Sequence, residues 1–177
     1  TKKRKFIIAD TPGHEQYTRN MITGASTADV AIILIDARKG VLEQTKRHSF
    51  LTSLVGIKKV IIAVNKMDLI NYDKTKYDSI INEYKIFAEK LNFNTIHDLP
   101  ISALNGDNVL KSTKSLNWFK GPSLISLLET IDVENIDNAF VLPIQNVIRP
   151  NLDYRAFSGR VSSGTIKVGK KIRSLPS

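Results

Sequence analysis

Short apolar runs alternate with stretches of helical period over the first 131 residues of the chain. A short apolar run that ends at a turn suits a strand buried on both faces of a parallel sheet, whereas apolar residues three or four apart suit an amphipathic helix. This pattern predicts strands at residues 6–9, 30–35, 60–64 and 96–101, and helices at about 14–25, 42–54, 77–91 and 123–131. Strands that alternate with helices predict an α/β domain with a mostly parallel sheet and flanking helices.

The buried faces of two of these helices follow from the spacing of their apolar residues. In the helix at 77–91 they stand at positions 77, 80, 81, 84, 87, 88 and 91, close to a period of 3.6. The stretch at 42–54 predicts an amphipathic helix with Leu51 and Leu54 on one face and the charged residues Glu43, Lys46 and Arg47 elsewhere.

The pattern changes after Ile131, where a polar and acidic stretch at 132–138 indicates a linker. From residue 140 on, β-like runs at 140–148, 154–161 and 167–175 follow one another with glycine-containing turns between them. Consecutive strands without helices predict a β domain, and three strands are too few to close a barrel. We therefore divide the chain into domains at residues 1–134 and 135–177.

Composition narrows the classes of protein that the chain can belong to. It has no cysteine, which excludes disulfides and thiolate metal sites and is compatible with a reducing compartment; we expect a cytoplasmic protein. The longest apolar runs are too short to span a bilayer. The net charge of +9 is consistent with polyanion or RNA contact, but the basic residues are scattered beyond residues 2–5, so we favour a solvated basic surface.

An acid and a Pro-Gly turn follow the first apolar run. Asp10 is placed at the carboxyl end of the strand predicted at 6–9, which in an open α/β sheet faces the ligand crevice. Its carboxylate suits Mg²⁺, directly or through water. Gly13 lets a backbone N–H approach a phosphate oxygen, and the imidazole of His14 can reach a water beside it. A strand-to-helix turn without a ligand is the alternative for this motif taken alone.

A second motif, Asn-Lys-x-Asp, follows the strand predicted at 60–64 and suits a guanine base. Asp68 can accept hydrogen bonds from the ring N1–H and the exocyclic amine, neither of which adenine offers in that arrangement. Asn65 can bond the base edge or tie neighbouring loops together, and Lys66 can lay its methylene stem along the base. Small Ser102 and Ala103 permit close approach, so the Ala103 N–H can donate to the guanine oxygen.

The phosphate-binding sequence Gly-x-x-x-x-Gly-Lys-Ser/Thr is absent from the chain. Residues 164–171 come nearest, but Lys171 replaces the hydroxyl residue and a strand pattern follows, so we predict a β-hairpin with Gly169 in its turn. Asp36 also ends an apolar run, but it lacks the Pro-Gly-His continuation and ranks below Asp10 as the metal ligand. We therefore expect a fragment without its N-terminal strand, phosphate loop and first switch.

These motifs resemble those of translation-factor-type GTPases and, more narrowly, of the GTPase subunits of bacterial sulfate adenylyltransferase (ATP sulfurylase). The general resemblance is carried by Asp10-Thr-Pro-Gly-His14, Asn65-Lys-Met-Asp68, Ser102-Ala-Leu104 and Leu142-Pro-Ile-Gln145. The narrower one rests on Glu15-Gln-Tyr-Thr-Arg-Asn-Met21, Gly24-Ala-Ser-Thr-Ala-Asp29, Ile35-Asp-Ala-Arg-Lys-Gly40, Arg149-Pro150, Asp153-Tyr-Arg155 and Leu175-Pro-Ser177. It covers essentially the whole chain.

The resemblance implies a partial P-loop GTPase domain at 1–134 and, at 135–177, the first part of a β-barrel like the second domain of elongation factor Tu. It implies GTP and Mg²⁺ as cofactors, with Asp10 holding Mg²⁺ through water, Gly13 sensing the γ-phosphate and His14 positioning the hydrolytic water. The residues that it assigns to guanine are Asn65, Lys66, Asp68, Ser102, Ala103 and Leu104.

The same resemblance implies an activity and a partner. GTP hydrolysis would be coupled to adenylyl transfer from ATP to sulfate by a separate catalytic subunit, giving adenosine 5′-phosphosulfate and pyrophosphate; no membrane or nucleic acid is implied. Without a phosphate loop, this chain alone should bind GTP weakly or not at all. Two alternatives stay open: an elongation-factor-like GTPase that binds aminoacyl-tRNA, and a non-enzymatic module whose nucleotide site has decayed.

Overall fold

The computed structural model describes residues 1–11, 18–133 and 139–175, and the chain forms two compact units, Thr1–Ile131 and Asp132–Ser177. In the first unit a three-stranded parallel sheet has the order β1 (Val30–Asp36), β2 (Lys59–Asn65) and β3 (Thr95–Pro100). The strands predicted at 30–35, 60–64 and 96–101 are thus confirmed.

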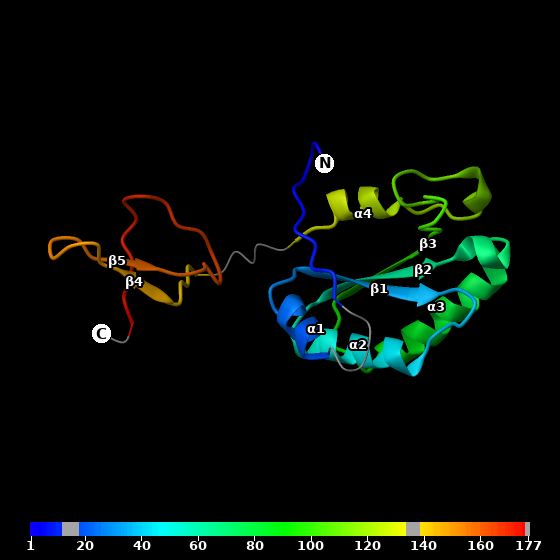
Figure 1. The fold of residues 1–177 in the computed structure, drawn as a ribbon, viewed down its shortest axis with the longest axis horizontal. Helices are drawn as coiled ribbons and strands as arrows, with labels where there is room; N and C mark the ends of the chain where they lie inside the picture. Colours follow the sequence, from blue (N-terminus) through cyan, green and yellow to red (C-terminus); the bar gives the residue numbers. More distant parts are fainter. Residues whose placement is uncertain (12–17, 134–138, 176–177) are drawn as a thin grey trace. The chain divides into compact units, whose positions relative to one another are not determined.

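Helices cover both faces of this sheet (Figure 1). Because the strand order runs in one direction, right-handed crossovers place α2 (Glu43–Leu54) and α3 (Lys74–Ala88) on the same face. On the other face lies α4 (Leu124–Thr130), and α1 (Thr18–Ala25) precedes β1. Two short 3₁₀ turns complete the unit, η2 (Met67–Ile70) and η3 (Lys114–Leu116).

Strand β2 forms the centre of the core, because β1 and β3 pair with its two edges and helices cover both of its faces. Its side chains alternate between the faces with the period of two of a strand. Val60, Ile62 and Val64 pack in the cluster that contains the buried residues of α3, while Ile61 and Ala63 pack with Leu127 and Ile131 at α4. The apolar run at 60–64 is fully buried, as predicted.

The spacing of apolar residues predicts the buried face of α3 correctly and that of α2 incorrectly. Helix α3 buries Tyr77, Ile80, Ile81, Tyr84 and Ala88, which confirms the period read from the sequence.

In α2 the predicted face is wrong, because Leu54 is exposed and the helix buries Thr45, Ser49 and Thr52 instead. Hydrogen bonds make this burial tolerable: Ser49 Oγ donates to the Thr45 carbonyl oxygen at 2.8 Å and accepts from the Tyr84 hydroxyl at 3.0 Å.

The prediction of a buried strand at residues 6–9 is also wrong. Ile7 and Ile8 are 95% and 86% exposed, and the segment pairs with none of the described strands. An extended segment gains ladder hydrogen bonds only beside a partner strand, and β1 pairs with β2 alone. The start of the chain is instead held at α4, where Arg4 Nη1 donates to the carbonyl oxygens of Leu128 at 3.0 Å and Ile131 at 2.7 Å.

The second unit contains a two-stranded antiparallel sheet of β4 (Asn146–Ile148) and β5 (Ala156–Ser158), extended by an isolated bridge between Val141 and Ser163. No barrel is seen in its described residues. The run at 167–175 is not a strand, because it has no paired neighbour there. The β-hairpin predicted around Gly169 is therefore wrong, because no strands flank it in the described residues. The turn itself is present, with a φ of +86° at Gly169 and a hydrogen bond from the Lys170 N–H to the Lys167 carbonyl oxygen at 3.1 Å.

Candidate functional site: the carboxyl ends of the sheet

The carboxyl ends of the three parallel strands bring together polar residues that are far apart in the sequence. Asp36 at the end of β1 is the register partner of Asn65 at the end of β2, and Val64 is the partner of Pro100 in β3. The loops that begin at residues 66 and 101 therefore start side by side. We call residues 65–68 and 102–104 together the base corner.

Asn65 joins the two loops of the base corner. Its Oδ1 accepts hydrogen bonds from the Lys66 N–H at 2.7 Å and from the Ala103 N–H at 3.0 Å. A backbone hydrogen bond from the Met67 N–H to the Ile101 carbonyl oxygen, at 3.2 Å, runs beside these contacts. Of the two roles considered for Asn65, the structure has the loop-tying one, and it engages the N–H of Ala103 that was expected to face guanine.

The side chain of Lys66 is held by Asp36, the acid that we ranked below Asp10 as a metal ligand. Lys66 Nζ lies 2.9 Å from Asp36 Oδ2, and Arg38 reaches the same carboxylate through Nε at 3.0 Å and Nη2 at 2.7 Å. The hydrogen bond from Arg38 is the main cause that holds the pKa of Asp36 far below its usual value, so the carboxylate stays charged. No sequence pattern marks this role of Asp36, which follows from the register that sets it beside Asn65.

Asp68 lies in the first turn of η2, next to Met67, whose side chain is fully buried and anchors the turn. One carboxylate oxygen, Asp68 Oδ1, is buried and has no hydrogen-bond donor among the described residues. An unsatisfied buried polar atom costs roughly 1–3 kcal/mol, and more when it is charged. A carboxylate can accept from a ligand with two neighbouring N–H donors, such as the edge of guanine, but Oδ1 has to turn toward the surface to take part, because the atom is shielded from solvent here.

Ser102 is buried, and hydrogen bonds within its own loop hold it. Its N–H donates to the Asp107 carbonyl oxygen at 3.1 Å, and its Oγ accepts from the Asn105 N–H at 3.3 Å. Ala103 and Leu104, which follow, are exposed. The backbone of Ala103 therefore lies at the surface of the base corner, where a planar ligand can reach it.

The residues expected at the phosphate end are described only in part. Gly13 and His14 lie outside the described residues. Asp10 is described and exposed, and in the described ranges there is no cluster of three or more acids, histidines or cysteines that could hold a metal. A single carboxylate still fits Mg²⁺, because this ion keeps several waters and takes its other ligands from a substrate's phosphates.

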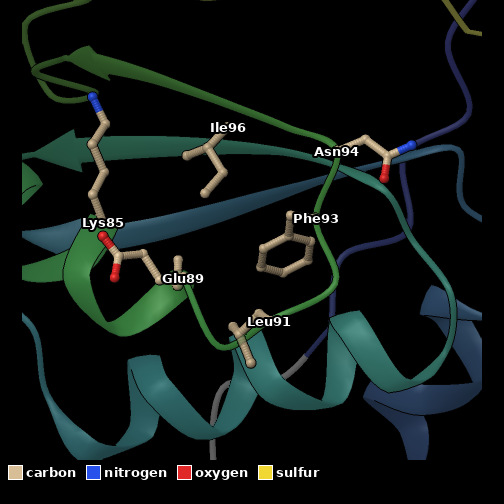
Figure 2. A pocket seen from close by; sticks show the side chains of 7 residues that line it. Lys85, Glu89, Leu91, Phe93, Asn94 and Ile96 are labelled. Carbon is tan, nitrogen blue, oxygen red and sulfur yellow. The ribbon is translucent and has the colours of Figure 1, made fainter.

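A pocket of about 390 Å³ opens elsewhere, where the end of α3 meets the start of β3 (Figure 2). It is lined by Lys85, Ala88, Glu89, Leu91, Phe93, Asn94 and Ile96. Since Ile96 lies near the amino end of β3, the pocket is at the amino ends of the strands, opposite the base corner at their carboxyl ends. None of the predicted site residues lines it.

The structure also contains no helix, in the parts of the chain that it describes, that is long and apolar enough to cross a membrane.

Curated relatives match the chain over its whole length. It is 58% identical over 180 residues to sulfate adenylyltransferase subunit 1 of Vibrio parahaemolyticus and 59% identical over 180 residues to the same subunit of Photobacterium profundum. It is also 58% identical over 179 residues to that of Aeromonas hydrophila. The chain spans 38% of the length of each of these relatives.

Solved structures and a family match place the fold. The crystal structure of sup35 complexed with GMPPNP matches 81% of this chain and 39% of its own, with a TM-score of 0.58 and 25% identity. Bacterial selenocysteine-specific elongation factor EF-Sec matches 86% of this chain and 24% of its own with a TM-score of 0.52 and 24% identity, which supports the fold alone. Residues 1–136 match the elongation factor Tu GTP binding domain. The chain belongs to the elongation factor Tu GTP-binding domain family.

Proposed function

We propose that the chain is part of the GTP-binding and GTP-hydrolysing subunit of a sulfate adenylyltransferase. The observation that carries the nucleotide part is the base corner, where Asn65 ties the two loops and Asp68 Oδ1 is buried without a described donor. The high identity to three subunits named sulfate adenylyltransferase subunit 1 supports the enzyme assignment.

In this proposal Asp68 reads guanine by accepting from its N1–H and exocyclic amine. Each hydrogen bond to a charged group contributes about 1.5–3 kcal/mol, so the two together account for roughly 3–6 kcal/mol against adenine. Lys66, held by Asp36, lays its methylene stem along the base. The Ala103 N–H donates to the guanine oxygen, and since it already donates to Asn65 Oδ1, binding shares or transfers that hydrogen bond. Ser102 and Leu104 flank this contact.

The phosphate end is assigned by the family resemblance. Asp10 holds Mg²⁺ through water, Gly13 senses the γ-phosphate and His14 positions the hydrolytic water. The bound Mg²⁺ would neutralise charge on the phosphate oxygens. Within the chain, residues 1–134 make up the GTPase domain and residues 135–177 the N-terminal part of a β-barrel domain like the second domain of elongation factor Tu.

The partner in this proposal is a separate catalytic subunit, and the complex is cytoplasmic, with no membrane or nucleic acid involved. The catalytic subunit transfers the adenylyl group of ATP to sulfate, giving adenosine 5′-phosphosulfate and pyrophosphate. The chain's own residues contribute the coupled hydrolysis of GTP. The relatives' printed name, a subunit 1, supports a complex of more than one kind of subunit.

The test uses the full-length protein together with its catalytic subunit, ATP and sulfate. We expect the rate of adenosine 5′-phosphosulfate formation to rise when GTP is added, with GTP consumed in step. Omission of sulfate is the control for uncoupled hydrolysis. Product formation that does not depend on GTP would contradict the proposal, and GTP hydrolysis stimulated by ribosomes and aminoacyl-tRNA instead would favour a translation factor.

A further inference from the structure

Tyr72 lies where the polypeptide leaves the first loop of the base corner, and its backbone is fixed on two sides. Its N–H donates to the Met67 carbonyl oxygen at 2.9 Å, next to Asp68. Its carbonyl oxygen accepts from Trp118 Nε1, also at 2.9 Å. The residue is therefore anchored both to the turn that carries Asp68 and to a segment more than forty positions further along the chain.

The Tyr72 side chain reaches across to the second loop of the base corner. Its hydroxyl donates to Asp107 Oδ2 at 2.5 Å and accepts from Asn105 Nδ2 at 3.3 Å. Asp107 and Asn105 are the same two residues whose backbone groups hold Ser102. Tyr72 thus joins the turn of Asp68 to the residues that fix the loop of Ala103.

The backbone of Tyr72 has a strained conformation. Its φ is +55°, and that of Asn71 before it is +53°. Asparagine tolerates the left-handed region, but a bulky aromatic residue rarely adopts it. Such a conformation persists only where surrounding contacts over-determine it, and these cluster at functional sites. The hydrogen bonds that its backbone and hydroxyl make are contacts of this kind.

We propose that Tyr72 is a positioning residue for guanine recognition, which rests on the function proposed above. Asn65 joins the two loops from the strand ends, and the Tyr72–Asp107 hydrogen bond joins them from the outer side. Together they fix the spacing between the Asp68 carboxylate and the Ala103 N–H. A base that contacts both groups needs this spacing to be set before it binds, because ordering a loose loop on binding would lower affinity.

The phenol keeps its proton in this role. The hydrogen bond to Asp107 is the main cause that raises the pKa of Tyr72 above its usual value, and burial acts in the same direction. Tyr72 therefore remains a donor to the Asp107 carboxylate throughout the physiological pH range.

A second tyrosine supplies a matched control. The Tyr77 hydroxyl donates to Asp98 Oδ2 at 2.6 Å, between α3 and β3 in the core of the same unit. Loss of this hydroxyl removes the same kind of hydrogen bond without touching either loop of the base corner. Stability effects and base-recognition effects can therefore be separated by comparing Tyr72→Phe with Tyr77→Phe.

The experiment measures the affinities of the full-length protein for GTP and ATP and takes their ratio as the base preference. We expect Tyr72→Phe to weaken GTP binding roughly tenfold, as for the loss of one hydrogen bond to a charged group, and to leave ATP binding unchanged. Asp107→Ala should match it, whereas Asp107→Asn, which keeps an acceptor oxygen, should restore most of the preference. Tyr77→Phe should lower Tm and leave the preference at the wild-type value.

Two outcomes would overturn the role of Tyr72, and a third would contradict the proposed function itself. If wild type prefers GTP and Tyr72→Phe keeps that preference within twofold, Tyr72 does not position the loops. If Tyr77→Phe lowers the preference as much as Tyr72→Phe, the effect is one of general stability. If wild-type protein binds GTP no better than ATP, the base corner does not read guanine, and both the function and the inference are wrong.

Discussion

The opening segment, residues 6–11, and the base corner look alike in the sequence and differ in the structure. In both places polar residues follow a short apolar run, which spans residues 6–9 in the opening segment and 60–64 before the base corner. At the base corner the run is a central strand, and hydrogen bonds from the Lys66 and Ala103 N–H groups to Asn65 Oδ1 tie its end to a neighbouring loop. In the opening segment Ile7 and Ile8 are exposed, and the described residues contain no strand that pairs with them.

The difference shows that polar residues at a strand end are brought together only where neighbouring strands and loops pack beside that end. The chain itself supplies the neighbours of Asn65, namely Asp36 on one side and Ala103 on the other. Asp10 follows a segment that pairs with none of the described strands. Its neighbour Thr11 lies against α1, where a Cβ on Gly24 would be 3.0 Å from Thr11 Cγ2. Contacts within this chain therefore already hold the two loops of the base corner together.

Asp68→Asn should break the base corner most strongly. An amide presents an N–H where guanine also presents donors, so GTP binding to the full-length protein should fall by about 3–6 kcal/mol, or two to four powers of ten. XTP, which carries an oxygen in place of the exocyclic amine, should become the preferred ligand. Competition between GTP and XTP for a fluorescent nucleotide measures this, and an unchanged preference for GTP would refute the role of Asp68.

Ile62→Ala and Ile8→Ala compare the two apolar runs directly. Ile62 is fully buried in β2, so its truncation should lower the free energy of unfolding of the 177-residue chain by about 2–5 kcal/mol. Ile8 is exposed, and Ile8→Ala should change the free energy of unfolding by less than about 0.5 kcal/mol. Urea denaturation followed by circular dichroism measures both. Equal losses would mean that the opening segment is packed as a strand after all.

Asp36→Asn should have the smallest effect, because it loosens the hold on Lys66 without removing a contact to the base. The Lys66–Asp36 pair is half-exposed, and such pairs contribute about 0–1 kcal/mol. GTP affinity of the full-length protein should therefore fall by less than about fivefold, and the gap from wild type should narrow as salt rises. A loss that persists at high salt would show that Asp36 acts by another route.

The stability that the Asp36 carboxylate contributes to the fold depends on pH in a defined direction. Because the pKa of Asp36 is lowered in the folded protein, mainly by Arg38, the charged carboxylate stabilises the fold above its ordinary unfolded value near 4. That contribution is lost as the pH falls through the lower folded value. Wild type should therefore lose its stability advantage over Asp36→Asn in strongly acidic solution and keep it at neutral pH.

Patterns that depend on burial by neighbouring segments of the same chain could be predicted from the sequence. Strand β2 and helix α3 were predicted correctly from the spacing of their apolar residues, because other segments of the chain bury those residues. The period of α2 gave the wrong face, since hydroxyl residues such as Ser49 are buried through hydrogen bonds that no hydropathy pattern contains. The run at 167–175 is not a strand because strand propensity does not supply a partner.

The candidate site shows the same division. Asn65, Lys66, Asp68 and Ser102 could be found by their order after predicted strands, and the structure brings them together. Their supporting residues could not, since the contacts of Asp36 and Tyr72 join positions thirty or more residues apart. Whether each residue binds nucleotide stays a prediction.

A crystal structure of the full-length protein with a non-hydrolysable GTP analogue would show directly whether Asp68 reads guanine. We expect both guanine nitrogens, N1 and the exocyclic amine, at about 2.7–3.2 Å from the Asp68 carboxylate, with the Ala103 N–H aimed at the guanine oxygen. The Tyr72–Asp107 hydrogen bond should be unchanged from that described here. A base bound elsewhere, with Asp68 Oδ1 still buried and without a donor, would contradict this role of Asp68.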